Sequence, residues 1–155
     1  MTLFTIGYEG LGIDEFTGFL VRNKVKRIAD VRKNPISRKK GFSKRKLAEA
    51  LAENGIEYTH VPELGVPTEW RKRAKNEEIT RAKMFRDYVK KILPKEPEAF
   101  EALEILIKRK GLALLCYEAD ASDCHRRFVA EELVKRSRGR LKVKDLQVLR
   151  PQGKY

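Results

Sequence analysis

The residues with the greatest capacity for chemistry lie together in one short segment of this chain. Residues 112–127 read LALLCYEADASDCHRR, so an apolar run ends in a cluster of polar and reactive side chains. The cluster holds both cysteines and one of the two histidines of the protein. Its members are Cys116, Glu118, Asp120, Asp123, Cys124, His125 and Arg126. Thiol, imidazole and carboxylate groups so close together favour nucleophilic, acid–base or metal-binding chemistry.

The second half of this segment is predicted to begin a helix, and this position gives Cys124 two interpretations. From residue 124 to 136 the apolar spacing is that of an amphipathic helix. Backbone amides at a helix start favour anions and lower a thiol pKa, so Cys124 is a candidate nucleophile and Arg126 a candidate phosphate ligand. Alternatively, an acidic or hydroxyl residue of the loop caps the helix, Cys124 packs inward, and Arg126 pairs with a carboxylate.

Two further side chains of the segment are candidates for moving protons. Glu118 emerges at the end of the predicted strand beside arginines, where a carboxylate can act as a general base or bind a ligand. His125 is the second candidate, and its alternative is a partly exposed helix residue. Cys116, at the end of the apolar run, is expected to be a small core residue. The predicted catalytic set is therefore Glu118, Cys124 and His125.

The two cysteines have two further interpretations. They can form one disulfide, particularly in the cytosol of a thermophile, and abundant Lys, Arg and Glu with only two glutamines is typical of such a source. A zinc ion could use Cys116, Cys124 and His125, with His60 as a further ligand. We expect no metal, because neighbouring cysteine and histidine side chains diverge on a helix and no C-x-x-C pair exists. The sequence does not define a cofactor.

A second candidate region is strongly basic. The chain has 35 basic and 22 acidic residues, and residues 21–46 hold twelve basic side chains against one acidic residue. Nucleic acid or a phosphorylated ligand is the expected partner of such a stretch, because cations beside phosphates release condensed counterions. The alternative is a solvated face that only increases solubility. In this region the candidate phosphate ligands are Arg32, Ser37 and Arg38, and the candidate nucleic-acid contacts are Lys39, Lys40, Lys44 and Arg45.

The spacing of apolar residues predicts strands that alternate with helices. The predicted strands span residues 3–8, 25–31, 57–61, 112–115 and 143–149. The predicted helices span residues 13–22, 44–54 with Ser43 as N-cap, 77–92, 97–108 and 124–136, and residues 62–76 are expected to be irregular. This order predicts an α/β three-layer sandwich, a mostly parallel sheet of about five strands with helices on both faces.

Ligands of such sheets bind at the carboxyl ends of the strands, so the residues that follow each strand are expected to form one polar rim. Tyr8 and Glu9 follow the first strand, and Asp30 and Arg32 follow the second. Alternation along a strand places Asp30 and Arg32 on one face and Val31 on the other. The Asp30 and Arg32 pair has a structural alternative, in which the two side chains bind each other.

The same strand ends carry a series of motifs that resembles the uncharacterised domain family DUF488. Two paired elements are specific: D-V-R-x-x-P-x-S-R and C-x-E-x-x-x-x-x-C-H-R. The full series is TIGYEG at 5–10, DVRKNPISR at 30–38, GF at 41–42, GIEYTHVPELG at 55–65 and CYEADASDCHR at 116–126. The resemblance implies an α/β fold and a shared polar site, and no particular reaction. Val66 departs from the family pattern, in which a second glycine often follows Leu64-Gly65.

Two functions follow from these observations. The first is a protein that binds or processes an anionic substrate, nucleic acid or nucleotide, at the rim. The second is a non-catalytic nucleic-acid-binding module that uses residues 21–46. We expect one domain over residues 1–155 with a frayed tail at 150–155, no membrane segment, and a cytoplasmic location. The sequence does not define an oligomeric state.

Overall fold

Parallel strands form the centre of the molecule. The computed structural model describes residues 1–148, and their five strands pair in the order β3-β2-β4-β1-β5, all parallel. The strand predicted at 143–149 is observed at Lys142–Leu146, and residue 149 and the tail predicted to be frayed at 150–155 lie outside the described residues. The strands are β1 (Thr2–Gly7), β2 (Arg27–Asp30), β3 (Glu57–His60), β4 (Leu112–Cys116) and β5 (Lys142–Leu146).

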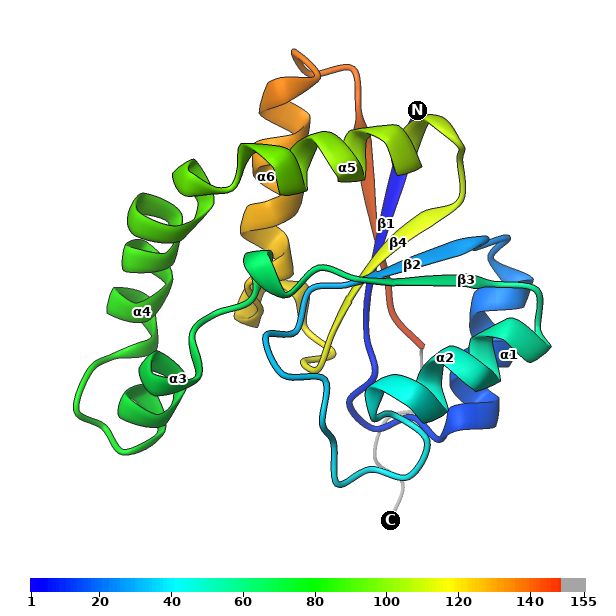
Figure 1. Ribbon diagram of the computed structural model, residues 1–155, viewed down its shortest axis with the longest axis horizontal. Coiled ribbons are helices and arrows are strands. Elements are labelled where there is room, and N and C mark those ends of the chain that lie inside the picture. The colour runs from blue at the N-terminus through cyan, green and yellow to red at the C-terminus, as the bar shows by residue number, and fades with distance from the viewer. Residues whose placement is uncertain (149–155) are drawn as a thin grey trace.

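Helices cover both faces of this sheet, as the α/β prediction requires. In Figure 1, α1 and α2 lie on one side of the strands, and α5 and α6 lie on the other, with α3 and α4 extending beyond the sheet. The α-helices are α1 (Ile13–Arg22), α2 (Lys44–Glu53), α3 (Thr68–Lys75), α4 (Arg81–Asp87), α5 (Pro97–Lys108) and α6 (Arg126–Arg136). The three-layer architecture is therefore confirmed.

Alternation along the strands divides the apolar core into two parts. Ile6, Ile28 and Leu115 point toward α1 and α2, where they pack with Phe16 and Leu47. The intervening strand residues point the other way. Leu3, Ala29 and Leu114 pack with Leu103 of α5 and Val129 of α6. Polar residues that leave the same strands are consequently directed to different faces of the rim.

The segment that follows β3 differs from the irregular stretch predicted for residues 62–76. It contains a short 3-10 helix, Pro62–Leu64, and then α3. No residue of α3 is buried, and its sequence TEWRKRAK contains almost no apolar residues. Apolar periodicity therefore gives no signal for a helix here, although the helix forms. Val66, the departure from the family pattern, packs in the core on the α5 and α6 side.

Two helix boundaries also differ from the prediction, and one predicted N-cap makes no capping bond. The helix predicted at 77–92 is divided into α4 and a π-helical turn, Tyr88–Ile92. Ser43 is the N-cap residue of α2, but its hydroxyl accepts from the Ser37 amide and does not cap the helix. Helix α6 begins at Arg126, two residues later than predicted, because Cys124 has an extended backbone.

Within residues 1–148, the helices are too short or too polar for any of them to cross a membrane.

Candidate functional site

Arg126 organises the segment between β4 and α6. Its side chain is fully buried, and Nη1 donates to the Glu118 carbonyl at 2.5 Å while Nη2 donates to the Ala119 carbonyl at 3.2 Å. Burial lowers the pKa of Arg126. Among the described residues no carboxylate bonds this guanidinium, and its Nε has no hydrogen-bond partner. The predicted pairing of Arg126 with a carboxylate is therefore wrong, and the side chain instead fixes the shape of the loop.

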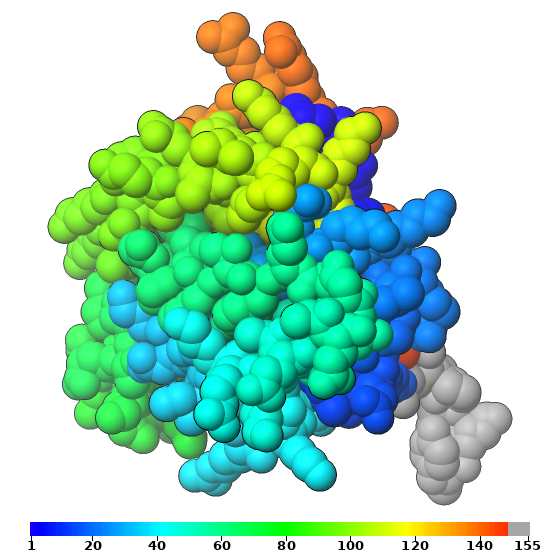
Figure 2. Space-filling model, turned by 45° about the vertical axis from the view of Figure 1, so that its right-hand side comes forward, coloured from blue at the N-terminus to red at the C-terminus, as the bar shows by residue number. Residues whose placement is uncertain are grey.

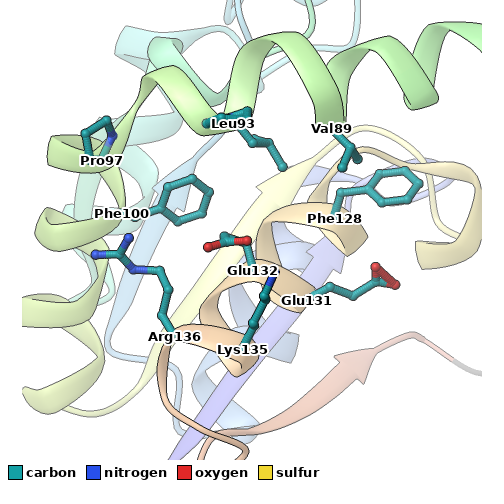
Figure 3. A pocket seen from close by; sticks show the side chains of 10 residues that line it. Val89, Leu93, Pro97, Phe100, Phe128, Glu131, Glu132, Lys135 and Arg136 are labelled. Atoms are coloured by element: carbon teal, nitrogen blue, oxygen red, sulfur yellow. The ribbon is translucent and has the colours of Figure 1, made fainter.

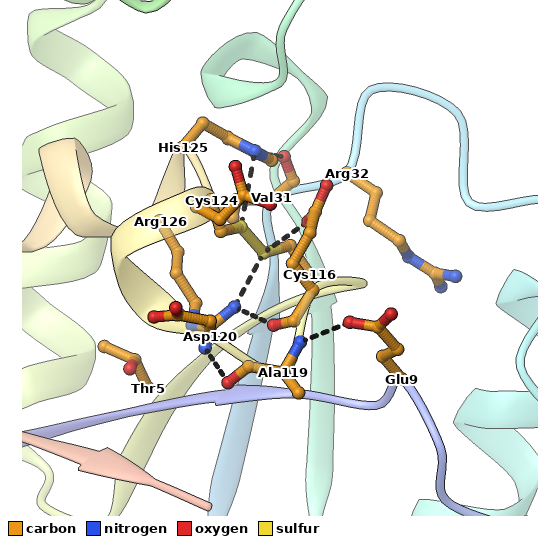
Figure 4. The surroundings of a disulfide bond; sticks show 12 residues. Thr5, Glu9, Val31, Arg32, Cys116, Ala119, Asp120, Cys124, His125 and Arg126 are labelled. Atoms are coloured by element: carbon orange, nitrogen blue, oxygen red, sulfur yellow. Dashed lines mark hydrogen bonds between the residues drawn. A yellow bond between two sulfur atoms is a disulfide. The ribbon is translucent and has the colours of Figure 1, made fainter. Parts of the chain in front are cut away.

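Two contacts hold the same loop in place, one from the last residue of β1 and one from the turn that follows it. The Glu9 carboxylate accepts from the Ala119 amide at 3.0 Å (Figure 4). At Gly7 the strand backbone lies so close to the loop that an added Cβ would be 1.7 Å from the Glu118 carbonyl oxygen. Only glycine permits this approach. The end of β1 thus sets the direction in which Glu118 leaves the strand.

The two cysteines form a disulfide below this loop. Cys116 ends β4, Cys124 precedes α6, and each is 1 % exposed. Arg126 Nη1 lies 3.2 Å from the Cys116 sulfur, and Glu118 Oε2 lies 3.7 Å from it. In this oxidised form neither cysteine has a thiol, so the nucleophile predicted at Cys124 stays a prediction for the reduced protein.

His125 is buried beside the disulfide, with 9 % of its surface exposed. Nε2 donates to the Val31 carbonyl at 2.7 Å, and Nδ1 lies 3.8 Å from the Cys124 sulfur (Figure 4). The argument that Cys124 and His125 side chains diverge on a helix is wrong, because both residues precede α6. Tyr88 packs edge-on against the imidazole, with ring centroids 5.6 Å apart. Burial lowers the pKa of His125 to about 4, so the ring is neutral at neutral pH.

Glu118 and His125 line a pocket that also involves α3 and α4. The pocket has a volume of about 330 Å³, and three cationic side chains surround it: Arg71 and Lys75 from α3 and Arg81 from α4. The sequence prediction missed all three cations. Arg71 and Lys75 are four residues apart and so share one helix face, a signal that becomes visible only when residues 68–75 are recognised as a helix.

The cations around this pocket differ in how firmly they are held. Arg81 donates to the Asp123 carboxylate at 3.0 Å and to the Asp123 carbonyl at 2.8 Å, and it lies 3.7 Å from Glu118 Oε1. Lys75 makes no ion pair with any residue in the described part of the chain. Burial raises the pKa of Glu118, and Arg81 opposes this shift. A carboxyl group with a raised pKa can donate as well as accept a hydrogen bond.

Asp30 and Arg32 form a separate network on the other face of the rim. Arg32 binds Asp30 with two bonds, Nε to Oδ1 at 2.8 Å and Nη2 to Oδ2 at 2.7 Å. Its Nη1 donates to the Tyr8 hydroxyl at 3.1 Å and to the Phe42 carbonyl at 2.8 Å, and Tyr58 donates to Asp30. Figure 4 shows the Arg32 side chain pointing away from the disulfide. The prediction that Asp30 and Arg32 share one face is confirmed, and this pairing is the structural alternative foreseen for them.

The remaining predicted contacts lie on the segment between β2 and α2 and on the first turn of α2. In Figure 2 this segment, coloured cyan, forms the lower part of the visible face. Arg38, Lys40, Lys44 and Arg45 are exposed, and Lys39 is partly exposed. Within residues 1–148, Arg45 pairs with Glu49, and the other four make no ion pair. The Ser37 hydroxyl accepts from the Lys39 amide, so it supports the turn.

A second hollow lies between α6 and the segment 89–100, which includes the start of α5 (Figure 3). Its volume is about 420 Å³, and Leu93, Phe100 and Phe128 line it together with charged residues at the mouth such as Glu132 and Lys135. None of the predicted site residues lines it. The smaller hollow beside Glu118 and His125 is therefore the better candidate site, because it combines cations, a carboxylate and an imidazole at the carboxyl end of the sheet.

The comparisons with known proteins agree with the motifs at the strand ends. No curated protein and no solved structure matches the chain. The family model for the domain of unknown function DUF488 matches residues 12–133, which include α1, β2 to β4, most of α6 and the whole candidate pocket. The chain therefore belongs to the DUF488 family.

Proposed function

We propose that the protein binds a phosphate-bearing ligand, a nucleotide or the end of a nucleic acid, in the pocket between α3, α4 and the β4–α6 segment. One observation carries the proposal: Arg71, Lys75 and Arg81 reach the same hollow from two helices. Arginine and lysine side chains bind phosphate through charge-assisted hydrogen bonds, and arginine can do so with two parallel bonds. Three cations around one carboxylate leave the pocket with a net positive charge.

The size and lining of the pocket limit the ligand. A volume of about 330 Å³ lies near the lower end of the range of about 300 to 1,000 Å³ for small-molecule sites. Val66, Met84 and Phe85 supply an apolar wall that can contact a base or sugar. Glu118 and His125 supply polar groups at the floor. This combination supports a nucleotide-sized ligand over a long polymer inside the pocket.

The arrangement of Arg81 reduces the cost of binding. Because Asp123 and Glu118 already hold its guanidinium, little side-chain freedom is lost when a phosphate arrives. Lys75 is exposed at the end of α3 and has no competing ion pair among residues 1–148. These two cations therefore have complementary roles, one fixed in position and the other free to follow the ligand.

Calorimetric titration of the oxidised full chain with adenosine monophosphate and with adenosine tests the proposal. We expect the monophosphate to bind and the nucleoside to bind at least about tenfold more weakly, since hydrogen bonds to charged groups contribute about 1.5 to 3 kcal/mol. Exchange of both Arg71 and Lys75 for Ala should weaken monophosphate binding by a similar factor. The matched control is the double exchange of Lys72 and Arg73 for Ala, which changes the same charges on α3 outside the pocket. Equal affinities for all of these proteins would refute the pocket assignment.

The second candidate function is a nucleic-acid-binding module, and the exposed basic side chains between β2 and α2 favour it. Their exposure fits sequence-independent contact with phosphates, as does the lack of ion pairs among the described residues for all of them except Arg45, which pairs with Glu49. Reversal of charge at Lys39 and Lys40 should then lower the salt dependence of oligonucleotide binding by about one unit of slope for each residue. The same variant should bind adenosine monophosphate like the unmodified protein if the pocket is the ligand site.

A further inference from the structure

We propose that, after reduction of the disulfide, Cys116, Cys124 and His125 bind one divalent metal ion of the zinc class in the interior, next to the pocket that His125 lines. Their ligand atoms, the two sulfurs and the imidazole Nδ1, lie within 4.8 Å of one another. The inference is independent of phosphate binding, because it concerns the reduced cysteines and has its own readout. It assigns the three residues a role that the oxidised form does not display.

The spacing of the donor atoms fits a tetrahedral ion. With bonds of about 2.3 Å to sulfur and 2.0 to 2.1 Å to nitrogen, two ligand atoms of a tetrahedral zinc site lie about 3.6 Å apart. The Cys124 sulfur and His125 Nδ1 are separated by 3.8 Å. The Cα atoms of the cysteines are 7.4 Å apart, beyond the usual range of about 4.4 to 6.8 Å for bridged cysteines. The backbone therefore leaves room for an ion between the two reduced side chains.

The hydrogen bond of His125 prepares the ring for this role. A carbonyl oxygen accepts only, so the bond between Nε2 and Val31 places the proton on Nε2. The neutral ring then presents the lone pair of Nδ1 to the Cys124 sulfur. Histidine ligands of metals commonly donate their other ring N–H to a carbonyl or carboxylate, which fixes the ring orientation. Tyr88 packs against the ring and restricts its rotation.

The neighbours of Cys116 fit a thiolate and an accessible fourth position. Arg126 Nη1 lies 3.2 Å from the sulfur, and no carboxylate in the described chain bonds this buried guanidinium. A metal-bound thiolate keeps lone pairs that can accept the Arg126 N–H, as outer hydrogen bonds do in other metal sites. On the pocket side, Glu118 Oε2 lies 3.7 Å from the same sulfur. Glu118, which lines the pocket, is therefore close enough to supply the fourth ligand of the ion or to hold a water molecule there.

The redox step is balanced by a dithiol reductant. The dithiol loses two electrons and two protons and becomes a disulfide, and the Cys116–Cys124 bond is cleaved to give two thiols. The metal ion then displaces both thiol protons to solvent and forms two bonds to sulfur. A small-molecule disulfide, such as the oxidised form of the reductant, reverses the process: it takes two electrons from the thiolates and two protons from solvent and becomes a dithiol, the Cys116–Cys124 bond forms again, and the ion is released. The same three residues thus alternate between a disulfide and a metal centre.

Titration of the full chain with Co²⁺, after reduction by dithiothreitol and its removal under nitrogen, tests the inference. We expect thiolate-to-cobalt charge-transfer absorption that saturates at one ion per chain and disappears when Zn²⁺ is added. The protein has no other cysteine, so this absorption reports Cys116 and Cys124 alone. Zinc should also raise the melting temperature of the reduced protein, since an ion that binds the native state stabilises it.

Variants identify the third ligand. Exchange of His125 for Gln should weaken Co²⁺ binding by about tenfold or more, because loss of even an outer partner costs about 10- to 100-fold. The matched control is His60→Gln, at the other histidine, which bonds the Arg32 carbonyl and should leave the titration unchanged. A disulfide that dithiothreitol leaves intact in the native protein would overturn the inference, as would a reduced protein without charge-transfer absorption. Equal effects of the two histidine variants would remove His125 from the site.

Discussion

Two arginines are buried at the carboxyl end of the sheet, and their surroundings differ. Arg32 faces the α1 and α2 side and binds Asp30 with two bonds. Arg126 faces the α5 and α6 side, where it bonds backbone carbonyls and the Cys116 sulfur. Burial lowers the pKa of both groups, but the bonds to Asp30 outweigh burial at Arg32 and raise its pKa.

The surroundings of Arg32 form a structural region, whereas those of Arg126 form a reactive one. At Arg32 every neighbouring polar group has a defined partner, so the network joins the end of β2 to Tyr8, Tyr58 and the Phe42 carbonyl. At Arg126 the buried charge has no bonded carboxylate within the described chain, and a disulfide, an imidazole and Glu118 lie beside it. Incomplete pairing of a buried charge is typical of sites that gain a further group, such as a ligand or a thiolate.

The largest effect is expected from Asp30→Ala. The exchange leaves the Arg32 guanidinium buried without its carboxylate, and loss of one partner of a buried pair costs about 3 to 5 kcal/mol of unfolding free energy. Urea denaturation measures the change. The control is Glu57→Ala, which removes the more exposed pair with Arg27 and should cost at most about 1 kcal/mol. If both variants lost the same small amount, the Arg32 network would not be structural.

A second large effect is expected at the contact between β1 and the loop that Arg126 holds. In Gly7→Ala the new methyl group meets the Glu118 carbonyl, and such overpacking costs about 3 kcal/mol, the upper end of the usual range. Thermal and chemical denaturation report the loss. Gly18→Ala, within α1, should instead stabilise the protein by about 0.5 to 1 kcal/mol, because Ala has the higher helix propensity. A neutral Gly7 variant would show that the loop can move away.

Reduction of the disulfide should have a slightly smaller effect. A bridge between cysteines eight residues apart restricts the unfolded chain by about 2.5 kcal/mol in the chain-entropy model. Denaturation with and without a phosphine reductant, in the absence of metal, measures this difference. Asp30→Ala should lower stability by the same amount in both redox states, because Asp30 and the disulfide lie on opposite faces of the neighbouring strands β2 and β4 and share no bonded partner. Strong non-additivity would show that the two arginine regions are coupled.

The smallest effect is expected from Glu118→Gln. Where Glu118 is ionised, its loss removes one negative charge from the pocket and should tighten adenosine monophosphate binding by about fivefold, or 1 kcal/mol. The stability should change little because the side chain is partly exposed. Calorimetric titration provides the measurement. The control is Asp87→Asn, which removes a carboxylate of α4 that does not line the pocket. Weaker binding in the Gln variant would mean that Glu118 contacts the ligand directly.

The sequence predicts this fold well where apolar periodicity is strong. The helices α1 and α5 have the predicted bounds, because each buries a continuous stripe of large apolar residues and ends at a polar boundary. Helix α3 buries no residue, so its pattern is invisible before the structure is known. The π-helical turn after α4 contains Tyr88, which is buried and packs against His125, a contact that a single sequence does not encode locally.

The site could be predicted only in part for the same reason. Glu118 and His125 follow a buried strand and therefore stand out. Arg71 and Lys75 join them through tertiary packing of α3, whose apolar residues are Trp70 and Ala74, and Arg81 joins them through packing of α4. The alternation rule places Asp30 with Arg32 and Val31 opposite, as observed. It does not decide whether Arg32 binds a ligand or Asp30. That outcome depends on Tyr8, Tyr58 and Phe42, which are distant in sequence from each other.

A map of amide chemical shifts in the oxidised protein during titration with adenosine monophosphate tests most directly whether the ligand binds in the proposed pocket. If the ligand binds there, the largest changes occur at residues 71–75, 81–85 and 118–125, around the pocket beside Arg126. Shifts confined to residues 33–46, or to the Arg32 network, would contradict it, because the ligand would then bind the exposed basic segment or the opposite face of the rim.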